Sequence, residues 1–192
     1  AGMNFPAEVI TEMFDAVRGH SALAKLSDQT PIPFNGVTEF VFNAAGEAAL
    51  VGEGDEVLIP DPSFVCYGPL ATMAGATPVY LNTYEKDDFR LMAEELEAKI
   101  TPNSKVLLLP YPNNPTGGIM SKEDYEPIAE VVKKHNLFVI CDEIYSELVY
   151  GGEKHFSFAA LPGMKERSIV LNGFSKAFAM TGWRVGYACG PA

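Results

Sequence analysis

Lys105-Val106-Leu107-Leu108-Leu109-Pro110-Tyr111-Pro112-Asn113-Asn114 is the stretch of sequence that decides the fold. Its first half is an apolar run without polar alternation, and its second half is a loop rich in proline and asparagine. A strand that is apolar on both sides is buried on both faces, as in a parallel sheet covered by helices. The stretch therefore predicts a central strand of an α/β domain, followed by a loop at the edge of the sheet.

The alternation of buried strands and helices extends in both directions along the chain. One helix is predicted from Ser121, which can cap it and has Asp124 in its first turn, to about His135. Another is predicted over Leu91–Ile100. Further strands are predicted at Glu56–Pro60, Thr77–Leu81, Leu137–Cys141 and Ser168–Leu171. Because such strands need cover on both faces, the predicted fold class is α/β, with three α/β/α layers and a mostly parallel sheet.

The composition is that of a globular protein with an excess of acidic groups. The chain has 192 residues, of which 47% are hydrophobic and 20% charged, enough for one domain with a sizeable core. The net charge of -11 argues against nucleic acid and anionic membranes as partners, since both attract clustered Lys and Arg. No apolar run approaches the roughly 20 residues of a membrane span, and the start of the chain lacks the pattern of a signal peptide.

Cysteines and histidines are scattered along the chain. The three cysteines are odd in number and widely spaced, which favours free thiols in a reducing cytoplasm. The three histidines form no metal-ligand spacing, so we expect no metal site.

Reactive side chains follow three successive strands of the predicted sheet. Asn114 follows the first strand, Asp142 and Tyr145 follow the second, and Lys176 follows the third. In parallel α/β sheets, ligands bind outside the carboxyl ends of the strands, so these groups are expected at one rim. A lysine at the end of a buried strand is expected to be desolvated, which lowers the pKa of its amine and favours attack on a carbonyl.

Three motifs in this order resemble the large domain of the class I/II aminotransferases of fold type I, which depend on pyridoxal 5'-phosphate (PLP). They are Asn113-Asn114-Pro115-Thr116-Gly117, Asp142-Glu143-Ile144-Tyr145, and Ser175-Lys176 followed by Gly182-Trp183-Arg184-Val185-Gly186. The resemblance runs from about Gly36 to the end. It implies a lead segment over residues 1–35 and a PLP-binding large domain over residues 36–192, with the C-terminal small domain of the family absent.

The resemblance implies a role for each catalytic group. Lys176 would form a Schiff base with PLP and later move the substrate proton. Asp142 would pair with the protonated pyridine nitrogen, and Tyr145 and Asn114 would hydrogen-bond the phenolic oxygen of the cofactor. Taken alone, Asp142 is also typical of a helix cap, Asn114 of a turn and Tyr145 of core packing.

The remaining cofactor contacts implied by the resemblance lie elsewhere in the chain. Arg184 would hold the phosphate, because its planar fork suits a phosphate group, although an ion pair is the alternative. Ser175 belongs to the same motif as Lys176. Val37 and Thr38 precede a predicted helix start and would bind the phosphate, and Phe64 would stack on the pyridine ring, with a common helix start and core packing as the alternatives.

The sequence also departs from the family pattern. No tyrosine precedes Tyr67, whereas relatives use an earlier tyrosine at the phosphate of the neighbouring subunit. Gly173 stands where many relatives have a phosphate-binding serine. The arginine that binds the substrate carboxylate belongs to the C-terminal domain, so we expect weak substrate affinity.

The resemblance predicts an aminotransferase that moves an amino group from aspartate, alanine or an aromatic amino acid to a 2-oxo acid. The alternatives are another PLP reaction, as in β-lyases, racemases or decarboxylases, or a PLP-binding and dimerisation domain with little turnover. A nucleotide-binding protein is disfavoured because no Gly-x-x-x-x-Gly-Lys-Ser/Thr is present. The family also implies a homodimer.

Overall fold

The structure, a computed structural model, describes residues 50–191. Within that range the sheet has six strands in the order β2-β1-β3-β4-β5-β6. The first five run parallel, and β6 runs antiparallel to β5. The strands are β1 (Glu56–Asp61), β2 (Thr77–Asn82), β3 (Ser104–Leu109), β4 (Phe138–Asp142), β5 (Ser168–Gly173) and β6 (Gly186–Cys189). The mostly parallel sheet is confirmed, and the predicted strands are shifted by at most two residues at either end.

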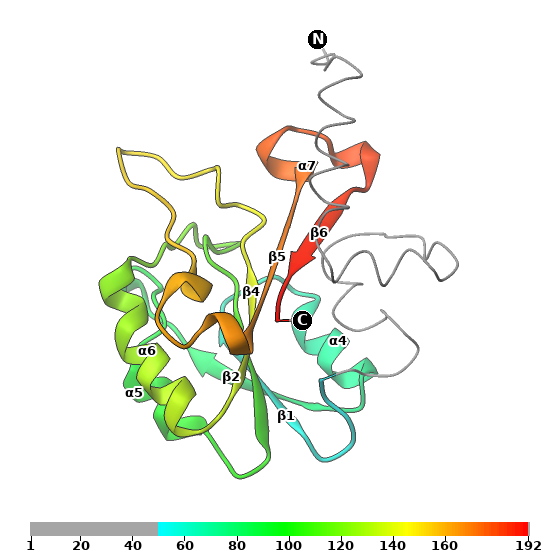
Figure 1. Ribbon diagram of the computed structural model, residues 1–192, viewed down its shortest axis with the longest axis vertical. Coiled ribbons are helices and arrows are strands. Elements are labelled where there is room, and N and C mark those ends of the chain that lie inside the picture. Colours follow the sequence, from blue (N-terminus) through cyan, green and yellow to red (C-terminus); the bar gives the residue numbers. More distant parts are fainter. Residues whose placement is uncertain (1–49, 192) are drawn as a thin grey trace. The chain divides into compact units, whose positions relative to one another are not determined.

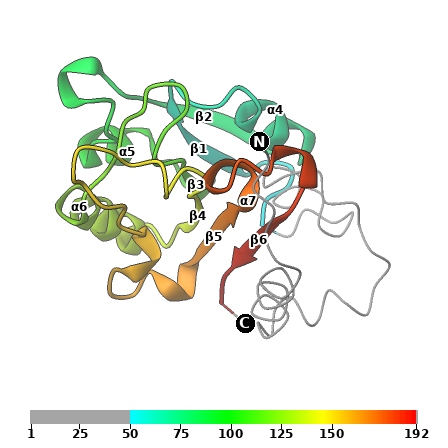
Figure 2. The ribbon, with the colours of Figure 1, turned by 90° about the horizontal axis from the view of Figure 1, so that it is seen from above.

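Helices cover both faces of this sheet. The α-helices of the described residues are α4 (Tyr67–Met73), α5 (Ala93–Lys99), α6 (Lys122–Lys134) and α7 (Phe174–Ala177). Short 3-10 turns are η1 (Glu85–Asp87), η2 (Phe158–Ala160), η3 (Lys165–Arg167) and η4 (Thr181–Trp183). Figures 1 and 2 show α5 and α6 on one face and α4 on the other, which confirms the three α/β/α layers.

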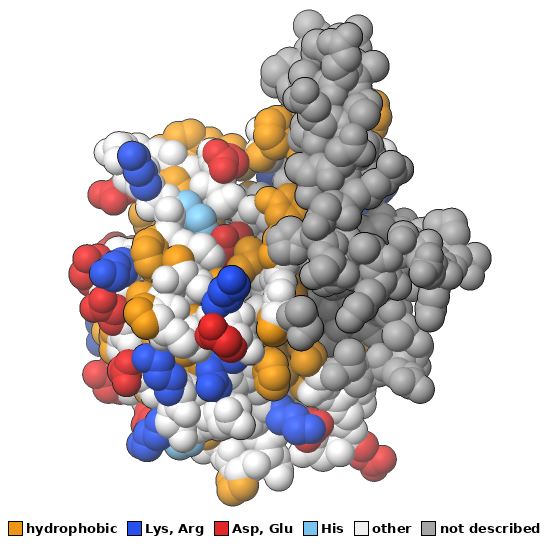
Figure 3. Space-filling view, viewed as in Figure 1, with side chains coloured by type: hydrophobic (Ala, Val, Ile, Leu, Met, Phe, Trp, Pro, Cys, Tyr) orange, Lys and Arg blue, Asp and Glu red, His pale blue; other side chains and the backbone are white. Residues whose placement is uncertain are grey.

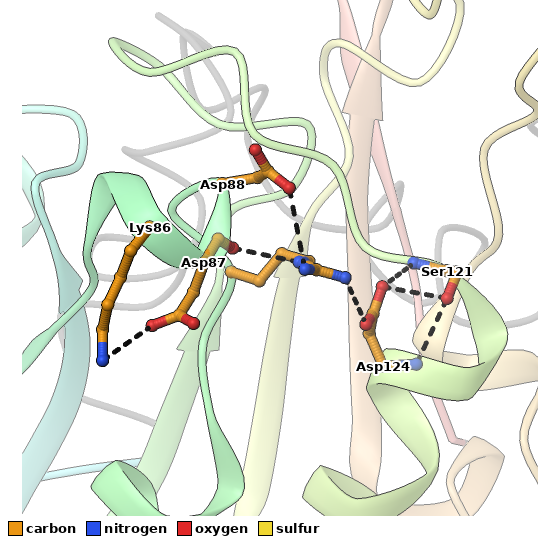
Figure 4. Close-up of polar contacts among 6 residues, drawn as sticks. Lys86, Asp87, Asp88, Ser121 and Asp124 are labelled. Atoms are coloured by element: carbon orange, nitrogen blue, oxygen red, sulfur yellow. Dashed lines mark hydrogen bonds and ion pairs between the residues drawn. The ribbon is translucent and has the colours of Figure 1, made fainter.

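The start of α6 matches the sequence prediction. The hydroxyl of Ser121 accepts a hydrogen bond from the Asp124 N–H at 3.2 Å, and the Ser121 N–H donates to the Asp124 carboxylate at 2.8 Å. This reciprocal capping box satisfies two N–H groups at the start of the helix. The Arg90 guanidinium lies 3.0 Å from the same carboxylate and so connects the segment after η1 to α6. Figure 4 shows these contacts with Asp124, Asp87 and Asp88 labelled.

The core consists of two apolar layers, one on each face of the sheet. Alternate residues of a strand point to opposite faces, so an all-apolar strand contributes to both layers. Leu107 and Leu109 of β3 pack on the α6 side with Ile128, whereas Val106 and Leu108 pack on the α4 side. Leu107 is fully buried. Truncation of such a side chain to alanine costs roughly 2–5 kcal/mol of folding free energy.

Polar pairs connect the amino ends of β1 and β3. Lys105 Nζ lies 2.9 Å from the Asp55 carboxylate, and the Ser104 hydroxyl donates to the Glu56 carboxylate at 2.7 Å. Thr101 donates to the same Glu56 oxygen at 2.7 Å. These bonds hold the two strands together at the edge opposite the one where the predicted reactive groups lie.

Among the helices of residues 50–191, none combines the length and the apolar character needed to cross a bilayer. On the face shown in Figure 3, acidic and basic side chains of the described residues are interspersed.

Candidate active site

The carboxyl ends of the parallel strands bring four of the predicted residues to one edge of the sheet. Asp142 is the last residue of β4, and Tyr145 lies in the turn that follows it. Asn114 follows β3, and Lys176 lies in α7, directly after β5. Figure 1 shows α7 and the yellow segment after β4 at this edge. The topology therefore places an amide, a carboxylate, a phenol and an amine at one rim.

Tyr145 connects two of these groups. The Lys176 amine lies 5.4 Å from the centroid of the Tyr145 ring, within the range of a cation–π contact. The Asn114 amide nitrogen lies 3.5 Å from the Tyr145 hydroxyl, a long and weak hydrogen bond. A phenol and an amide so close together can both donate to one further oxygen atom placed between them.

Asp142 is a buried carboxylate with two hydrogen-bond donors from the protein. It is 6% exposed; the Tyr67 hydroxyl donates to Oδ2 at 2.8 Å and the Ile144 N–H donates to Oδ1 at 3.2 Å. Burial raises the pKa of Asp142 above its ordinary value, and the charge of Glu143 acts in the same direction, while the two hydrogen bonds lower it. Because an ionised buried carboxylate is costly without a positive partner, Asp142 is suited to a cationic group.

Tyr67 is a site residue that the sequence analysis missed. It is buried, begins α4, and its ring lies 5.7 Å from that of Phe64 in an edge-to-face arrangement. Burial first, and then the neighbouring Asp142, raise its pKa far above the ordinary tyrosine value. Tyr67 therefore keeps its proton and remains a donor to Asp142. No local signal in the sequence marks Tyr67, because its partner Asp142 lies 75 residues further along the chain.

Asn113 was also missed, and it shapes the loop that carries Asn114. Its carbonyl Oδ1 accepts hydrogen bonds from the Thr116 hydroxyl at 3.0 Å and the Thr116 N–H at 3.3 Å. Its backbone N–H donates to the Gly118 carbonyl at 2.9 Å, which closes the loop. Gly117 has a φ of +74°, a conformation that glycine adopts without strain. The buried Asn113 thus fixes the backbone from which Asn114 projects.

The expectation that Lys176 is desolvated is wrong, because its side chain is exposed. The predicted strand was expected to deliver the lysine into a buried end, but β5 stops at Gly173 and Lys176 lies in the single turn of α7. In that turn the amine points over the ring of Tyr145 at the open rim.

The other predicted cofactor residues differ in exposure and in their contacts. Arg184 is exposed, has a φ of +53°, and donates to the Thr181 carbonyl at 3.0 Å. Phe64 is 37% exposed and Ser175 is half-buried. Val37 and Thr38 lie outside the described residues.

Gly173 is packed too tightly for a larger side chain. A Cβ atom at this position would lie 3.0 Å from the Val185 carbonyl oxygen and 3.1 Å from the Gly186 Cα. Both contacts are with the segment that leads into β6, so a serine here requires that backbone to shift. The close pairing of β5 with β6 gives the departure from the family pattern at Gly173 a physical reason.

A separate hollow of about 600 Å³ lies beside the start of α6. Asp142, Tyr145 and Lys176 do not line it. Arg90, the arginine in its wall, is paired with Asp88 and Asp124. The hollow is therefore distinct from the rim at the ends of β4 and β5.

Comparison with known proteins agrees with this geometry. The family described as aminotransferase class I and II matches residues 5–192. The chain is 48% identical to the aromatic-amino-acid aminotransferase 2 of Thermococcus litoralis over 76% of its length, and 48% identical to the aspartate aminotransferase of Pyrococcus abyssi over 77%. It spans only 38% of the length of each relative.

A solved structure shows the same fold. The aromatic aminotransferase of Pyrococcus horikoshii superimposes with a TM-score of 0.78 and 45% sequence identity, covering 82% of this chain and 42% of that one. Together with the family match over almost the whole sequence, this shows that the chain belongs to the class I and II family of PLP-dependent aminotransferases.

Proposed function

We propose that the chain binds PLP as a Schiff base on Lys176 and takes part in the transfer of an amino group from an L-amino acid to a 2-oxo acid. Aspartate, alanine and aromatic amino acids are the proposed donors. The relatives named as aspartate and aromatic-amino-acid aminotransferases support this class of substrate. The single observation that carries the proposal is the grouping of Asp142, Tyr145, Asn114 and Lys176 at one sheet edge.

The donor set at this edge fits the cofactor. Asp142 is a buried carboxylate suited to a cationic partner, and the pyridine nitrogen of PLP becomes cationic when it is protonated. Tyr145 and Asn114 lie 3.5 Å apart and can both donate to the phenolic oxygen. Lys176 supplies the amine for the aldehyde carbon. When bound, the cofactor supplies an electron-withdrawing ring that stabilises a carbanion.

Each side chain then has a defined task in the reaction. Asp142 holds a proton on the ring nitrogen, and the bond from Tyr67 keeps its carboxylate oriented toward that proton. Lys176, with its amine free, would accept the proton from the substrate Cα and return it to C4' of the cofactor, the former aldehyde carbon. Its exposed position on the short turn of α7 leaves the amine room to move between these two points.

The remaining assignments stay proposals that the described geometry supports less directly. Arg184 and Ser175 would bind the phosphate together with Val37 and Thr38, and Phe64 would stack on the ring. Phe64 already packs edge-on against Tyr67, the residue that holds Asp142. The division into a lead segment over residues 1–35 and a PLP-binding domain over residues 36–192, the homodimer and the cytoplasmic location also remain predictions.

Two experiments test the proposal in order. Hydride reduction of the PLP-saturated protein, followed by peptide mapping, is expected to leave the cofactor on Lys176. Addition of L-aspartate to unreduced protein should then convert the bound cofactor to its amine form, with oxaloacetate released in equal amount. Label on another lysine contradicts the site. Formation of D-aspartate or of a decarboxylated amine, without conversion of the cofactor to its amine form, indicates a racemase or decarboxylase reaction instead.

A further inference from the structure

Glu143 is a buried carboxylate that the proposed function does not use. It directly follows Asp142, and its side chain is 8% exposed. Its Oε1 accepts a hydrogen bond from the Ser157 hydroxyl at 2.6 Å, and its Oε2 lies 2.8 Å from His155 Nε2. Both oxygens are therefore satisfied, which a carboxylate removed from water requires.

Asp142 and Glu143 point to opposite faces of the sheet, as successive residues of a strand do. Asp142 contacts Tyr67 of α4. Glu143 lies on the face where α6 packs, and its charge adds to burial in raising the pKa of Cys141 in that layer. The two adjacent carboxylates are thus held by separate sets of partners.

Glu143 is also the base of the turn that carries Tyr145. Its N–H donates to the Leu171 carbonyl of β5 at 2.9 Å, and its own carbonyl accepts from the Ser146 N–H at 2.9 Å. The Asn172 amide donates to the Ser146 hydroxyl at 3.0 Å. A displacement of Glu143 would therefore be transmitted to the backbone of Tyr145.

An exposed segment connects Tyr145 to His155. Tyr150 in this segment is 78% exposed, and Gly151 and Gly152 have φ values of +77° and +89°. Residues 147–154 contain no helix or strand. Because such a segment has little packing of its own, the contact between residues 143 and 155 is what closes it at its base.

We propose that Glu143 is a positioning residue: held by His155 and Ser157 on one face of the sheet, it fixes the turn that presents Asp142 on the other face and Tyr145 beside Lys176. Glu143, His155 and Ser157 together form what we call the Glu143 clamp. The effect on the cofactor rests on the proposed function, whereas the clamp itself involves only residues of this chain. Since Ser157 donates to Glu143 rather than to His155, the trio lacks the bond by which a histidine activates a serine.

The chain offers a matched control for this proposal. His135 Nε2 lies 2.9 Å from the Glu97 carboxylate, a second pair of the same chemistry that joins α6 to α5. Its side chains are 28% and 37% exposed. Glu97→Ala therefore removes a carboxylate–imidazole contact, together with the Lys134–Glu97 ion pair, without touching the turn after β4.

The first measurement needs no cofactor. Hydrogen exchange of the cofactor-free protein, read by mass spectrometry, is expected to speed up about tenfold or more in the peptide covering residues 143–157 of Glu143→Ala. Peptides from β3 and α6 should exchange as in the wild type. Glu97→Ala should leave the 143–157 peptide unchanged. If Glu143→Ala fails to fold, Ser157→Ala and His155→Asn each remove one bond, and both should speed up exchange of the same peptide.

The second measurement reads the cofactor site. Glu143→Ala is expected to weaken PLP binding roughly 10- to 100-fold, the range found when a partner that orients a metal ligand is removed. The absorbance of bound PLP should change with pH at a higher midpoint, because Tyr145 is less well placed to donate. Glu143→Gln keeps the shape and can still accept from Ser157, so it should bind PLP within about threefold of the wild type.

The outcomes separate the two proposals. A wild-type protein that is not labelled on Lys176 contradicts the proposed function. The hydrogen-exchange measurement still tests whether the Glu143 clamp holds the turn, because it needs no cofactor. A labelled wild type whose Glu143→Ala variant shows unchanged local exchange and unchanged PLP affinity overturns the positioning role. Equal losses in Glu143→Gln and Glu143→Ala also overturn it, because charge rather than position would then matter.

Discussion

The two edges of the sheet hold carboxylates in opposite ways. At the amino ends of the strands, Asp55 pairs with Lys105 at 2.9 Å, and the hydrogen bond from Lys105 lowers the pKa of Asp55. At the carboxyl ends, Asp142 receives a hydrogen bond from Tyr67 at 2.8 Å, yet burial raises its pKa. Asp55 is paired with a cation of the same chain, Lys105. The described hydrogen-bond partners of Asp142 are both neutral donors.

The difference shows what each edge is built for. Pairs such as Asp55–Lys105 are complete within the chain and screened by water, so they join strands and contribute little to stability. The opposite edge keeps an acid in a costly environment beside a phenol, an amide and an amine. Such perturbed groups concentrate at functional sites, because their cost is offset when a ligand binds.

The largest contrast between the edges is expected from two lysine substitutions. Lys176→Ala should abolish covalent attachment of PLP and lower turnover by at least about 10²- to 10⁴-fold, the contribution of a positioned proton-transfer group. Lys105→Ala at the other edge should leave both unchanged. Reduction with borohydride and intact-protein mass spectrometry measure attachment, and circular dichroism checks the fold. Equal labelling of the two variants would contradict the assignment of Lys176.

A second contrast comes from the two aspartates. Asp142→Ala should leave PLP bound, although more weakly, and lower the rate of amino transfer roughly 10²- to 10³-fold, since a charge placed for the transition state is lost. Asp55→Ala should transfer amino groups at the wild-type rate. Single-turnover absorbance with L-aspartate compares them. Near-normal turnover in Asp142→Ala would show that the ring nitrogen does not need this carboxylate.

Tyr67→Phe should have a smaller effect on the same edge. It removes one hydrogen bond to a charged group, worth about 1.5–3 kcal/mol of folding free energy, and leaves the Asp142 carboxylate less firmly oriented, so PLP affinity should fall. The ring stays in place, and packing against Phe64 is preserved. Equilibrium titration with PLP measures the change. The matched control, Tyr125→Phe, lies in the other core layer and should bind PLP as the wild type does.

The smallest expected effect is on how stability depends on pH. It has opposite signs for Asp142 at one edge and Asp55 at the other. The folded pKa of Asp142 is raised, so its contribution is present below the unfolded value of about 3.9 and lost as pH rises through the folded value. Asp142→Asn should therefore stabilise the cofactor-free protein at pH 7, with the gain vanishing below about pH 4.

Asp55 should behave in the reverse way. Its folded pKa is lowered, so the stability that it contributes is present above about pH 3.9 and lost as pH falls through the folded value. Asp55→Asn should therefore destabilise at pH 7 and be neutral in acid. Urea denaturation between about pH 2 and pH 8 measures the free energy of unfolding of both variants, and a range that starts below the unfolded pKa of about 3.9 is needed to see both changes. The same dependence of this free energy on pH in the two variants would contradict the contrast.

Local patterns were enough to predict the strands and the start of α6. An apolar run such as that of β3 needs no partner to be recognised, and Ser121 with Asp124 forms its capping box within one turn. The carboxyl-edge rule also grouped Asn114, Asp142, Tyr145 and Lys176 from strand order alone. Their roles in catalysis are predictions.

What sequence reasoning missed depends on contacts between distant segments. Tyr67 and Asp142 are 75 residues apart, and nothing local to either indicates their bond. β6 is a strand because it pairs with β5, and its four residues are only half-buried. The exposure of Lys176 follows from where β5 ends, and the bounds of elements are the least certain part of any reading of a sequence.

The neighbouring acids at the end of β4 make this strand unusually sensitive to insertion. If the pairing of β4 slipped by one residue so that Glu143 took the place of Asp142, Glu143 would face Tyr67, and Asp142 would take the place of Cys141 in the layer of α6. Both layers would still receive a carboxylate, so the protein could fold, yet the acid facing α4 would be one methylene longer. Alignment of β4 with β3 and β5 is therefore a constraint on chemistry as much as on folding, and gaps within Phe138–Asp142 should be selected against more strongly than core substitutions there.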